Sequence, residues 1–286
     1  MNTIYAHLDM TRQNFHNRVN YLMFIEMEKQ EILKLLPKIR EEHPFMSSRI
    51  MYKLVQPLYF GRDKFEKLCF SAGYKLKQQK NFVRTTNSLG VTRFLNLIIG
   101  IQLTGINKIW VSDITYYRIG DRFYYLTFIM DLYSREIVGY SCSQDLMTES
   151  TTLPALRMAL AKITKSDLNG LILHSDGGGQ YYSKKLLKLT RVYHIKNSMA
   201  ETVYENAHAE RINGTIKNSY LMGYAPSNFA ELITMLKRAV NVYNNIRPHS
   251  AIGGQVTSSL RKVMKLSTNN ELLTKRKKVA KKEKVN

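Results

Sequence analysis

The chain has 286 residues, and 43 lysines and arginines against 22 aspartates and glutamates give it a formal net charge of +21 at pH 7. With 44% hydrophobic residues, 15 glycines and 6 prolines, the composition excludes a collagen-like, low-complexity or largely disordered chain. The length indicates roughly two domains. A charged, solvated surface needs far less net charge than this, so the excess favours a polyanionic partner, with nucleic acid first.

The positive charge is concentrated at the two ends of the chain. Residues 1–107 have 16 basic and 8 acidic side chains, residues 108–260 have 17 and 12, and residues 261–286 have 10 and 2. Cys69 and Cys142 lack zinc-ligand spacing, which indicates a reducing compartment and no structural zinc. The polar start and the interrupted apolar stretch at 94–106 predict neither an export signal nor a membrane contact. We therefore expect a cytoplasmic protein.

Residues 1–75 are predicted to form several short helices. Thr11 is a candidate N-cap, and apolar side chains recur at helical spacing between Ile32 and Ile39. Further helices are expected over residues 45–55 and 62–72, with Gly73 ending the second.

Basic residues on the last of these helices, Arg62, Lys64 and Lys67, are compatible with a helix-turn-helix unit that binds DNA. A small helical bundle of any other function would show the same pattern. Residues 76–107 have no clear period and are predicted to be a linker.

From residue 108 the apolar pattern changes to that of an α/β domain. Strands are predicted over 109–119, 122–132, 136–143 and 171–173. Helices are predicted from a Thr148 cap to Ile163, and over 184–192, 206–221 and 229–245. This order predicts a mixed sheet flanked by helices over 108–260. The basic tail at 261–286 follows, and its last part, 275–286, is predicted to be a disordered arm.

Three carboxylates in this region are candidates for chemistry. Asp113 lies in an apolar strand, where an isolated carboxylate would be costly unless it binds a partner or cation. Asp176 follows the 171–173 strand and precedes three glycines, at the edge where mixed sheets bind ligands. Glu210 shares a helical strip with Asn213 and Lys217. Taken singly, each has a plain alternative: an outward strand residue, an Asp-Gly turn and a solvated helical face.

Five ordered segments resemble a known family: WVSDITYY around Asp113, DLYSREIVGY at 131–140, LHSDGGGQYYS around Asp176, ENAHAERINGTIKN around Glu210, and YNNIRPHSAIGG at 243–254. On these segments the chain resembles the DDE-type bacterial insertion-sequence transposases of the orfB type, in insertion sequence family three. Their catalytic core is similar to that of retroviral integrases. REEHP and GRDKFEKL resemble the helix-turn-helix region of these proteins more loosely.

The resemblance implies a ribonuclease H-like five-stranded sheet in which Asp113, Asp176 and Glu210 are the catalytic acids and metal ligands. Two departures stand out. The 33 residues between Asp176 and Glu210 are two fewer than the family usually has, which a loop can absorb. Gly177 replaces the long polar residue that usually follows the second aspartate.

Three convergent carboxylates favour hard divalent cations, so we expect two Mg²⁺ ions, for which Mn²⁺ can substitute. Water would then nick DNA at an element end, and the freed 3′-hydroxyl would attack a second phosphodiester. The resemblance implies both steps, with a dimer or larger assembly on the element ends and target DNA. A DNA-binding protein without catalysis and a ribonuclease H-like enzyme acting on RNA remain as alternatives.

Candidate DNA contacts accompany the acids. Lys217 matches a basic position of the family and is assigned to the DNA backbone, against the alternative of a plain surface lysine. Arg211 and His174 flank the acids, and His174 could equally be a packed imidazole. Arg247 lies in the 247–249 segment, for which packing of the core is as good an interpretation as contact with DNA. The basic tail should bind phosphates without sequence preference.

Overall fold

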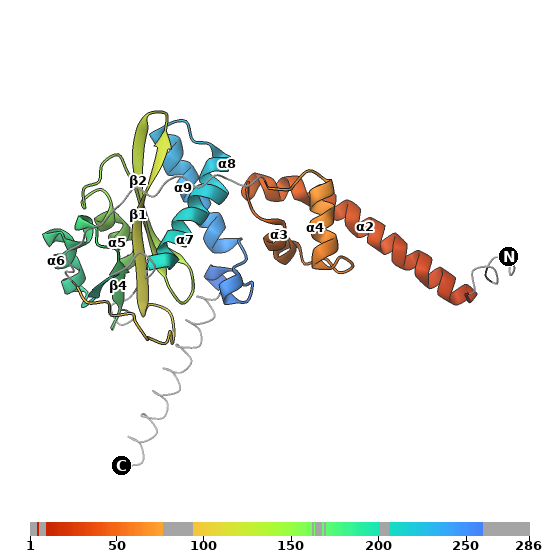
Figure 1. Cartoon of the computed structure of the whole chain (residues 1–286), viewed down its shortest axis with the longest axis horizontal. Coiled ribbons are helices and arrows are strands. Elements are labelled where there is room, and N and C mark those ends of the chain that lie inside the picture. Colours follow the sequence, from red (N-terminus) through yellow and green to blue (C-terminus); the bar gives the residue numbers. More distant parts are fainter. Residues whose placement is uncertain are drawn as a thin grey trace, which may run out of the picture. The chain divides into compact units, whose positions relative to one another are not determined.

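The computed structural model describes Tyr5 and residues 10–76, 94–161, 163, 168, 170–200 and 206–259 (Figure 1). The chain divides into two compact units, Met1–Asn81 and Phe82–Asn286. The predicted tail at 261–286 and most of the predicted linker lie outside the described residues.

The described part of the first unit includes the helices α2 (Arg12–Glu42), α3 (Ser48–Val55) and α4 (Arg62–Ser71). The prediction of separate short helices before residue 45 is wrong, because α2 runs unbroken through 31 residues and includes Pro37. Thr11 caps it as predicted, with its hydroxyl accepting from Asn14 N–H. The three helices bury a small apolar core of Ile32, Leu36, Met46, Met51, Phe60, Phe65 and Cys69.

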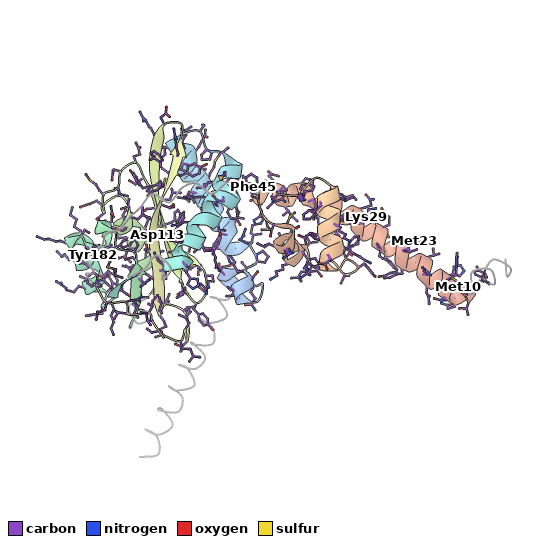
Figure 2. The ribbon with its side chains drawn as sticks, viewed as in Figure 1. Met10, Met23, Lys29, Phe45, Asp113 and Tyr182 are labelled. Carbon is purple, nitrogen blue, oxygen red and sulfur yellow. The ribbon has the colours of Figure 1, made fainter. Side chains whose placement is uncertain are left out.

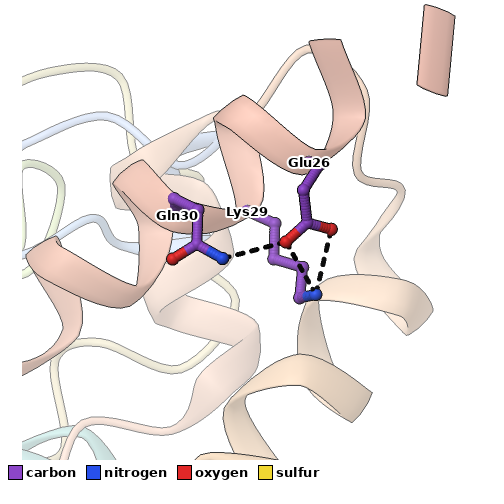
Figure 3. Close-up of polar contacts among 3 residues, drawn as sticks. All are labelled: Glu26, Lys29 and Gln30. Atoms are coloured by element: carbon purple, nitrogen blue, oxygen red, sulfur yellow. Dashed lines mark hydrogen bonds and ion pairs between the residues drawn. The ribbon is translucent and has the colours of Figure 1, made fainter. Parts of the chain in front are cut away.

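The N-terminal half of α2 exposes apolar side chains, among them Met23 and Met27, which are 58% and 62% exposed (Figure 2). Its helical conformation is supported there by surface contacts. The Glu26 carboxylate accepts hydrogen bonds from Lys29 at 3.0 Å and Gln30 at 2.9 Å (Figure 3). Such an exposed pair contributes about 0.2–0.5 kcal/mol, so most of the stability of the unit comes from its core.

The second unit is built on a five-stranded sheet in the order β3-β2-β1-β4-β5. Its strands are β1 (Ile109–Ile119), β2 (Arg122–Asp131), β3 (Ile137–Ser143), β4 (Ile172–Ser175) and β5 (Lys196–Met199). The first three form an antiparallel meander, whereas β4 pairs parallel with both β1 and β5. This mixed sheet confirms the predicted fold class.

Helices cover both faces of the sheet (Figure 1). On one side lie α5 (Thr152–Leu160) and α6 (Lys184–Val192). On the other lie α7 (Ala207–Ile216) and α9 (Phe229–Asn245). Alternation along β1 assigns Ile109 and Val111 to the core under α7 and α9, and Trp110 to the core under α5 and α6. Asp113, two residues after Val111, lies on the same face of β1 and therefore faces α7.

The path of α5 over the sheet depends on a glycine in β3. A Cβ at Gly139 would lie 2.1 Å from the Ala155 carbonyl oxygen, so only glycine admits the helix at this distance. The helix begins at Thr152, not after Thr148 as predicted. The Thr148 hydroxyl instead donates to the carbonyl of Gln180, at 3.2 Å.

Three irregular elements complete this unit. A 3-10 helix, η2 (Gly179–Tyr182), follows β4. The helix that carries Glu210 continues from α7 into a π-helical turn, η4 (Lys217–Leu221), and then α8 (Met222–Tyr224). A second 3-10 turn, η5 (Ser250–Ile252), follows α9. The predicted helix over 206–221 is thus confirmed in extent, with a wider final turn.

Residues 94–107 pack on the second unit, so the prediction of a linker is wrong for this stretch. Leu97, Ile98 and Leu103 lie against the core beneath α7 and α9. The Ser198 hydroxyl accepts from Leu97 N–H at 2.9 Å. No helix in the described ranges combines the length and apolarity needed to cross a bilayer.

Candidate active site

Asp113 and Asp176 are brought side by side by the pairing of two strands. Ser112 of β1 pairs with Ser175 of β4, and each aspartate is the next residue along its own strand direction. Burial, followed by the charge of Asp176, raises the pKa of Asp113 to about 8. Burial also raises the pKa of Asp176. The structure therefore brings together two carboxylates, 63 positions apart in the sequence, at a cost in free energy.

Both aspartates are held by local hydrogen bonds. Asp113 Oδ1 accepts from the backbone N–H of Ile114 at 2.9 Å. Asp176 Oδ1 accepts from Gly178 N–H at 3.2 Å, and a Cβ at Gly178 would lie only 3.1 Å from this oxygen. Gly178, two residues after Asp176, thus permits a tight turn around the carboxylate. At Gly177, a Cβ would lie 3.0 Å from the methyl group of Met199.

Glu210 lies in the first turn of α7 and is exposed. Its charge contributes to the raised pKa of Asp113, after burial and Asp176. Among the residues that the structure describes, no three acidic, histidine or cysteine side chains are close enough together to hold a metal ion. Glu210 therefore acts on Asp113 through its charge but does not complete a three-ligand metal site with the two aspartates in this structure.

Asn213 connects the α7 helix to Asp113. Its Nδ2 donates to Asp113 Oδ2 at 2.7 Å, and the side chain is 5% exposed. Its Oδ1 is buried and has no partner within the described residues. The sequence analysis placed Asn213 on the same helical strip as Glu210, about one turn along the helix, but did not predict that it contacts Asp113.

Neutral side chains under the aspartates hold β1 in place. Ser112 donates through Oγ to the Phe128 carbonyl and lies 2.8 Å from the hydroxyl of Tyr181, which is fully buried between η2 and the sheet. On the other side, Asn206 Nδ2 donates to the Ser112 carbonyl at 3.2 Å. Asn206 lies at the N-cap position of α7, but its side chain contacts the strand and not the helix. Sequence patterns did not predict these contacts.

Lys217 lies at the start of the π-helical turn, on the same side of the helix as Asn213. Its Nζ donates to the Tyr116 carbonyl of β1 at 3.3 Å. Burial lowers the pKa of Lys217, and the charge of Asp113 opposes this. The ammonium is thus directed toward β1 near the aspartates, and its contact with DNA stays a prediction.

His174 is completely buried, with 0% of its surface exposed. Its Nδ1 lies 2.9 Å from the Ser198 hydroxyl of the neighbouring strand β5. The prediction that it binds DNA is wrong for this structure, since no part of the ring reaches the surface. The alternative of a packed imidazole is the one observed.

Arg247 is partly buried next to Tyr220 of the π-helical turn. Its Nη1 donates to the Tyr220 hydroxyl at 3.4 Å, and its guanidinium lies 5.8 Å from the ring centre. His249 packs edge-on against Tyr243 at 4.5 Å. These contacts favour the packing alternative for this segment, with the DNA role of Arg247 still a prediction.

The remaining predicted DNA contacts are exposed. Arg211 lies on α7 next to Glu210. In the first unit, Arg62, Lys64 and Lys67 lie on the surface of α4. Arg62 pairs with the adjacent Asp63 at 2.8 Å.

The sheet order, the paired aspartates and the glutamate on the covering helix define a class of protein, the enzymes with an integrase catalytic core. Two integrase core domain family models match residues 104–204 and 193–256, which together include all three acids. The chain is 31% identical to an uncharacterized 31 kDa protein of insertion element IS600 from Shigella sonnei, over 85% of this chain and 92% of that protein. The chain belongs to the IS3 family of DDE transposases.

Other relatives match about half of the chain. The chain is 32% identical to the transposase InsF of insertion sequence IS3A from Escherichia coli K12, over 53% of this chain and 52% of that protein. Among solved structures, the HTLV-2 integrase catalytic core domain in complex with magnesium is 24% identical, with a TM-score of 0.42, over 54% of this chain and 96% of that one.

Proposed function

We propose that this transposase cuts DNA at the ends of an insertion element and joins the freed 3′ ends to target DNA, with Asp113, Asp176 and Glu210 as its catalytic carboxylates. The observation that carries the proposal is the half-buried aspartate pair that follows the last paired residues of β1 and β4. Burial, and after it the charge of Asp176, raises the pKa of Asp113 to about 8. Such an arrangement is retained where a cation or substrate uses it.

The chemistry of the aspartate pair fits a hard divalent cation, although no three ligand side chains among the described residues lie close enough together to hold one as they stand. Asp113 and Asp176 supply oxygen ligands, and their burial disfavours the charged carboxylates unless a cation is bound. Glu210 lies on the adjacent helix. These three side chains would hold two Mg²⁺ ions, with Mn²⁺ as a substitute. When bound, the metal supplies activation of the attacking oxygen and stabilisation of the leaving oxygen in a displacement at phosphorus.

The same carboxylates would serve both steps, since only the nucleophile changes. In the first, the oxygen of water forms a bond to phosphorus while the bond to the 3′ oxygen breaks, which leaves a 3′-hydroxyl and a 5′-phosphate. In the second, that 3′ oxygen forms the new bond, and the target strand releases its own 3′ oxygen. Asn213 and the Ile114 N–H hold the Asp113 carboxylate during both steps.

The test is Mg²⁺-dependent nicking of duplex DNA that carries the native element ends. Asp113→Asn, Asp176→Asn and Glu210→Gln should each abolish nicking and keep DNA binding. Asp121→Asn is the matched control, because Asp121 is an exposed acid in the turn between β1 and β2 whose ion pair is with Arg118. Retained nicking in any of the three active-site variants would sink the proposal.

Two alternatives have their own outcomes in this experiment. A protein that binds the DNA but nicks nothing in Mg²⁺ or Mn²⁺ would be a DNA-binding protein without catalysis. Cleavage of an RNA–DNA hybrid in preference to duplex DNA would indicate a ribonuclease H-like enzyme. We favour the transposase, because all three acids are present on the elements that the fold requires.

The partners follow from the reaction. Joining two element ends to one target requires at least two active sites, so we propose a homo-dimer or larger assembly on DNA. Arg62, Lys64 and Lys67 on α4 would contact DNA as part of a helix-turn-helix unit over 1–75, and the basic tail would bind phosphates nearby. The relatives are bacterial, so we place the reaction in the cytoplasm, on the nucleoid.

A further inference from the structure

The turn between β2 and β3 is held firmly in an unusual backbone conformation. Arg135 has a φ of +64°, in the left-handed region that residues other than glycine seldom adopt. The buried Asp131 carboxylate accepts from the N–H groups of Tyr133 and Ser134 at 3.1 and 2.7 Å, and from the Ser134 hydroxyl at 3.0 Å. The Arg135 N–H donates to the Asp131 carbonyl at 2.9 Å. Strain held this firmly is typical of functional positions.

The turn directs the Arg135 side chain onto the helix that carries Glu210. Arg135 Nη1 lies 2.9 Å from His208 Nδ1. A guanidinium can only donate, so His208 accepts at Nδ1 and keeps its proton on Nε2. Arg211 lies three residues further along α7, on the same side of the helix as His208. We call these three residues, Arg135, His208 and Arg211, the Arg135 cluster.

The two arginines of the Arg135 cluster bring positive charge together without a direct ion pair among the described residues. Burial, with a smaller contribution from Arg211, lowers the pKa of Arg135. None of the ion pairs among the described residues includes a member of the cluster. The nearby Asp131 carboxylate already accepts hydrogen bonds from its own turn and from Asn107 N–H. Partly buried cations with free N–H donors are stabilised by an anion between them.

The position of the cluster relative to the acids follows from helix geometry. Successive residues on α7 are rotated by about 100°. Asn213 therefore projects toward Asp113 on one side, whereas His208 and Arg211 project from nearly the opposite side, and Glu210 lies between. A DNA strand that crosses the exposed face of α7 near Glu210 would meet the acids on one side of the helix and the Arg135 cluster on the other.

We propose that the Arg135 cluster binds a backbone phosphate of DNA, across α7 from the aspartate pair. The inference rests on the proposed function, because it requires DNA to lie over the active site. The planar fork of arginine matches two phosphate oxygens, and the fixed turn keeps Arg135 in place before DNA arrives. A phosphate held there would fix the register of the strand relative to Glu210.

The test measures the DNA affinity of the full chain at several salt concentrations for wild type, Arg135→Gln and Arg211→Gln. Each lost phosphate contact should reduce the slope of log K against log salt by about 0.9 and weaken binding several-fold at low salt. Arg211 is exposed, so Arg211→Gln should fold even if Arg135→Gln does not. Arg118→Gln is the control, because Arg118 is exposed and paired with Asp121.

The DNA probes identify the source of the phosphate. An altered slope with element-end duplex alone assigns the phosphate to the element, and an altered slope with random duplex as well assigns it to any bound DNA, target included. Unchanged slopes in both variants, or an equal change in Arg118→Gln, would overturn the inference. If wild type binds DNA and never nicks it, the proposed reaction fails while an altered slope still supports the phosphate site.

Discussion

Replacing Asn213 with alanine separates the placement of Asp113 from the stability of the fold. Asn213 Nδ2 is the side-chain donor to Asp113 Oδ2, at 2.7 Å. The other donor to this carboxylate is the N–H of Ile114, the next residue in the chain. Without Asn213, the carboxylate keeps only that local contact and can rotate away from Asp176.

Two opposing effects set the magnitude. A hydrogen bond to a charged group contributes about 1.5–3 kcal/mol to stability. The same substitution removes the buried Asn213 Oδ1, which lacks a partner among the described residues. A buried oxygen without a hydrogen bond destabilises the fold by about 1–3 kcal/mol, so its removal offsets the lost hydrogen bond. The free energy of unfolding should therefore change by less than about 2 kcal/mol. Loss of a residue that orients a metal ligand typically costs about 10- to 100-fold in metal affinity or activity.

The assay is a Mg²⁺ titration of nicking by Asn213→Ala, together with its thermal unfolding and its DNA affinity. We expect the Mg²⁺ midpoint to rise at least tenfold while DNA affinity and unfolding temperature stay close to wild type. Asn244→Ala is the control, because buried Asn244 bonds both the N–H and the carbonyl of Ile137 and touches no acid of the site. An unchanged Mg²⁺ midpoint in Asn213→Ala, or an equal shift in Asn244→Ala, would refute the reasoning.

Three further predictions concern stability. Burial lowers the pKa of His249 to about 4. The stability that the neutral imidazole contributes is therefore complete above pH 6.5 and is lost as the pH falls toward 4, by about 3 kcal/mol. Urea unfolding over this range should show a smaller dependence of stability on pH in His249→Gln than in wild type. Gly139→Ala should destabilise the core by about 1–3 kcal/mol or more, because its Cβ would meet the Ala155 carbonyl at 2.1 Å, whereas Gly61→Ala, with nothing within 4 Å, should change the unfolding temperature little. Asp113→Asn should raise the unfolding temperature of the metal-free protein at pH 8, since a folded-state pKa of about 8 means that stability falls as the pH rises from about 4 to 8; equal pH profiles for variant and wild type would contradict this.

The expected gain in stability from Asp113→Asn illustrates the tension between function and folding at this site. Two half-buried aspartates lie side by side just beyond the parallel pairing of β1 and β4. Among the described neighbours of Asp113, only Lys217 opposes the rise in its pKa with positive charge. A sequence selected for stability alone would place neutral residues here.

Most elements of the second unit could be predicted from the sequence, with instructive exceptions. The five-stranded sheet was expected from the resemblance, but β5, with the sequence KNSM, has too little apolar character to be recognised by pattern. Its place is decided by pairing with β4. In the first unit, the polar stretches of α2 suggested breaks that the continuous backbone hydrogen bonds of a 31-residue helix do not have.

The amino-acid sequence by itself identified the family of this protein, because the motifs around Asp113, Asp176 and Glu210 have the residue types and order of that family. Only the tertiary structure decided which groups surround them. His174 was expected to reach DNA, but its side chain is buried against β5, because the pairing of β4 with β5 encloses it. Asn213 meets Asp113, and Arg135 meets His208, because sheet and helix packing join residues that are 100 and 73 positions apart. Local sequence patterns encode the faces of strands and helices, whereas contacts between elements are settled by how those faces pack.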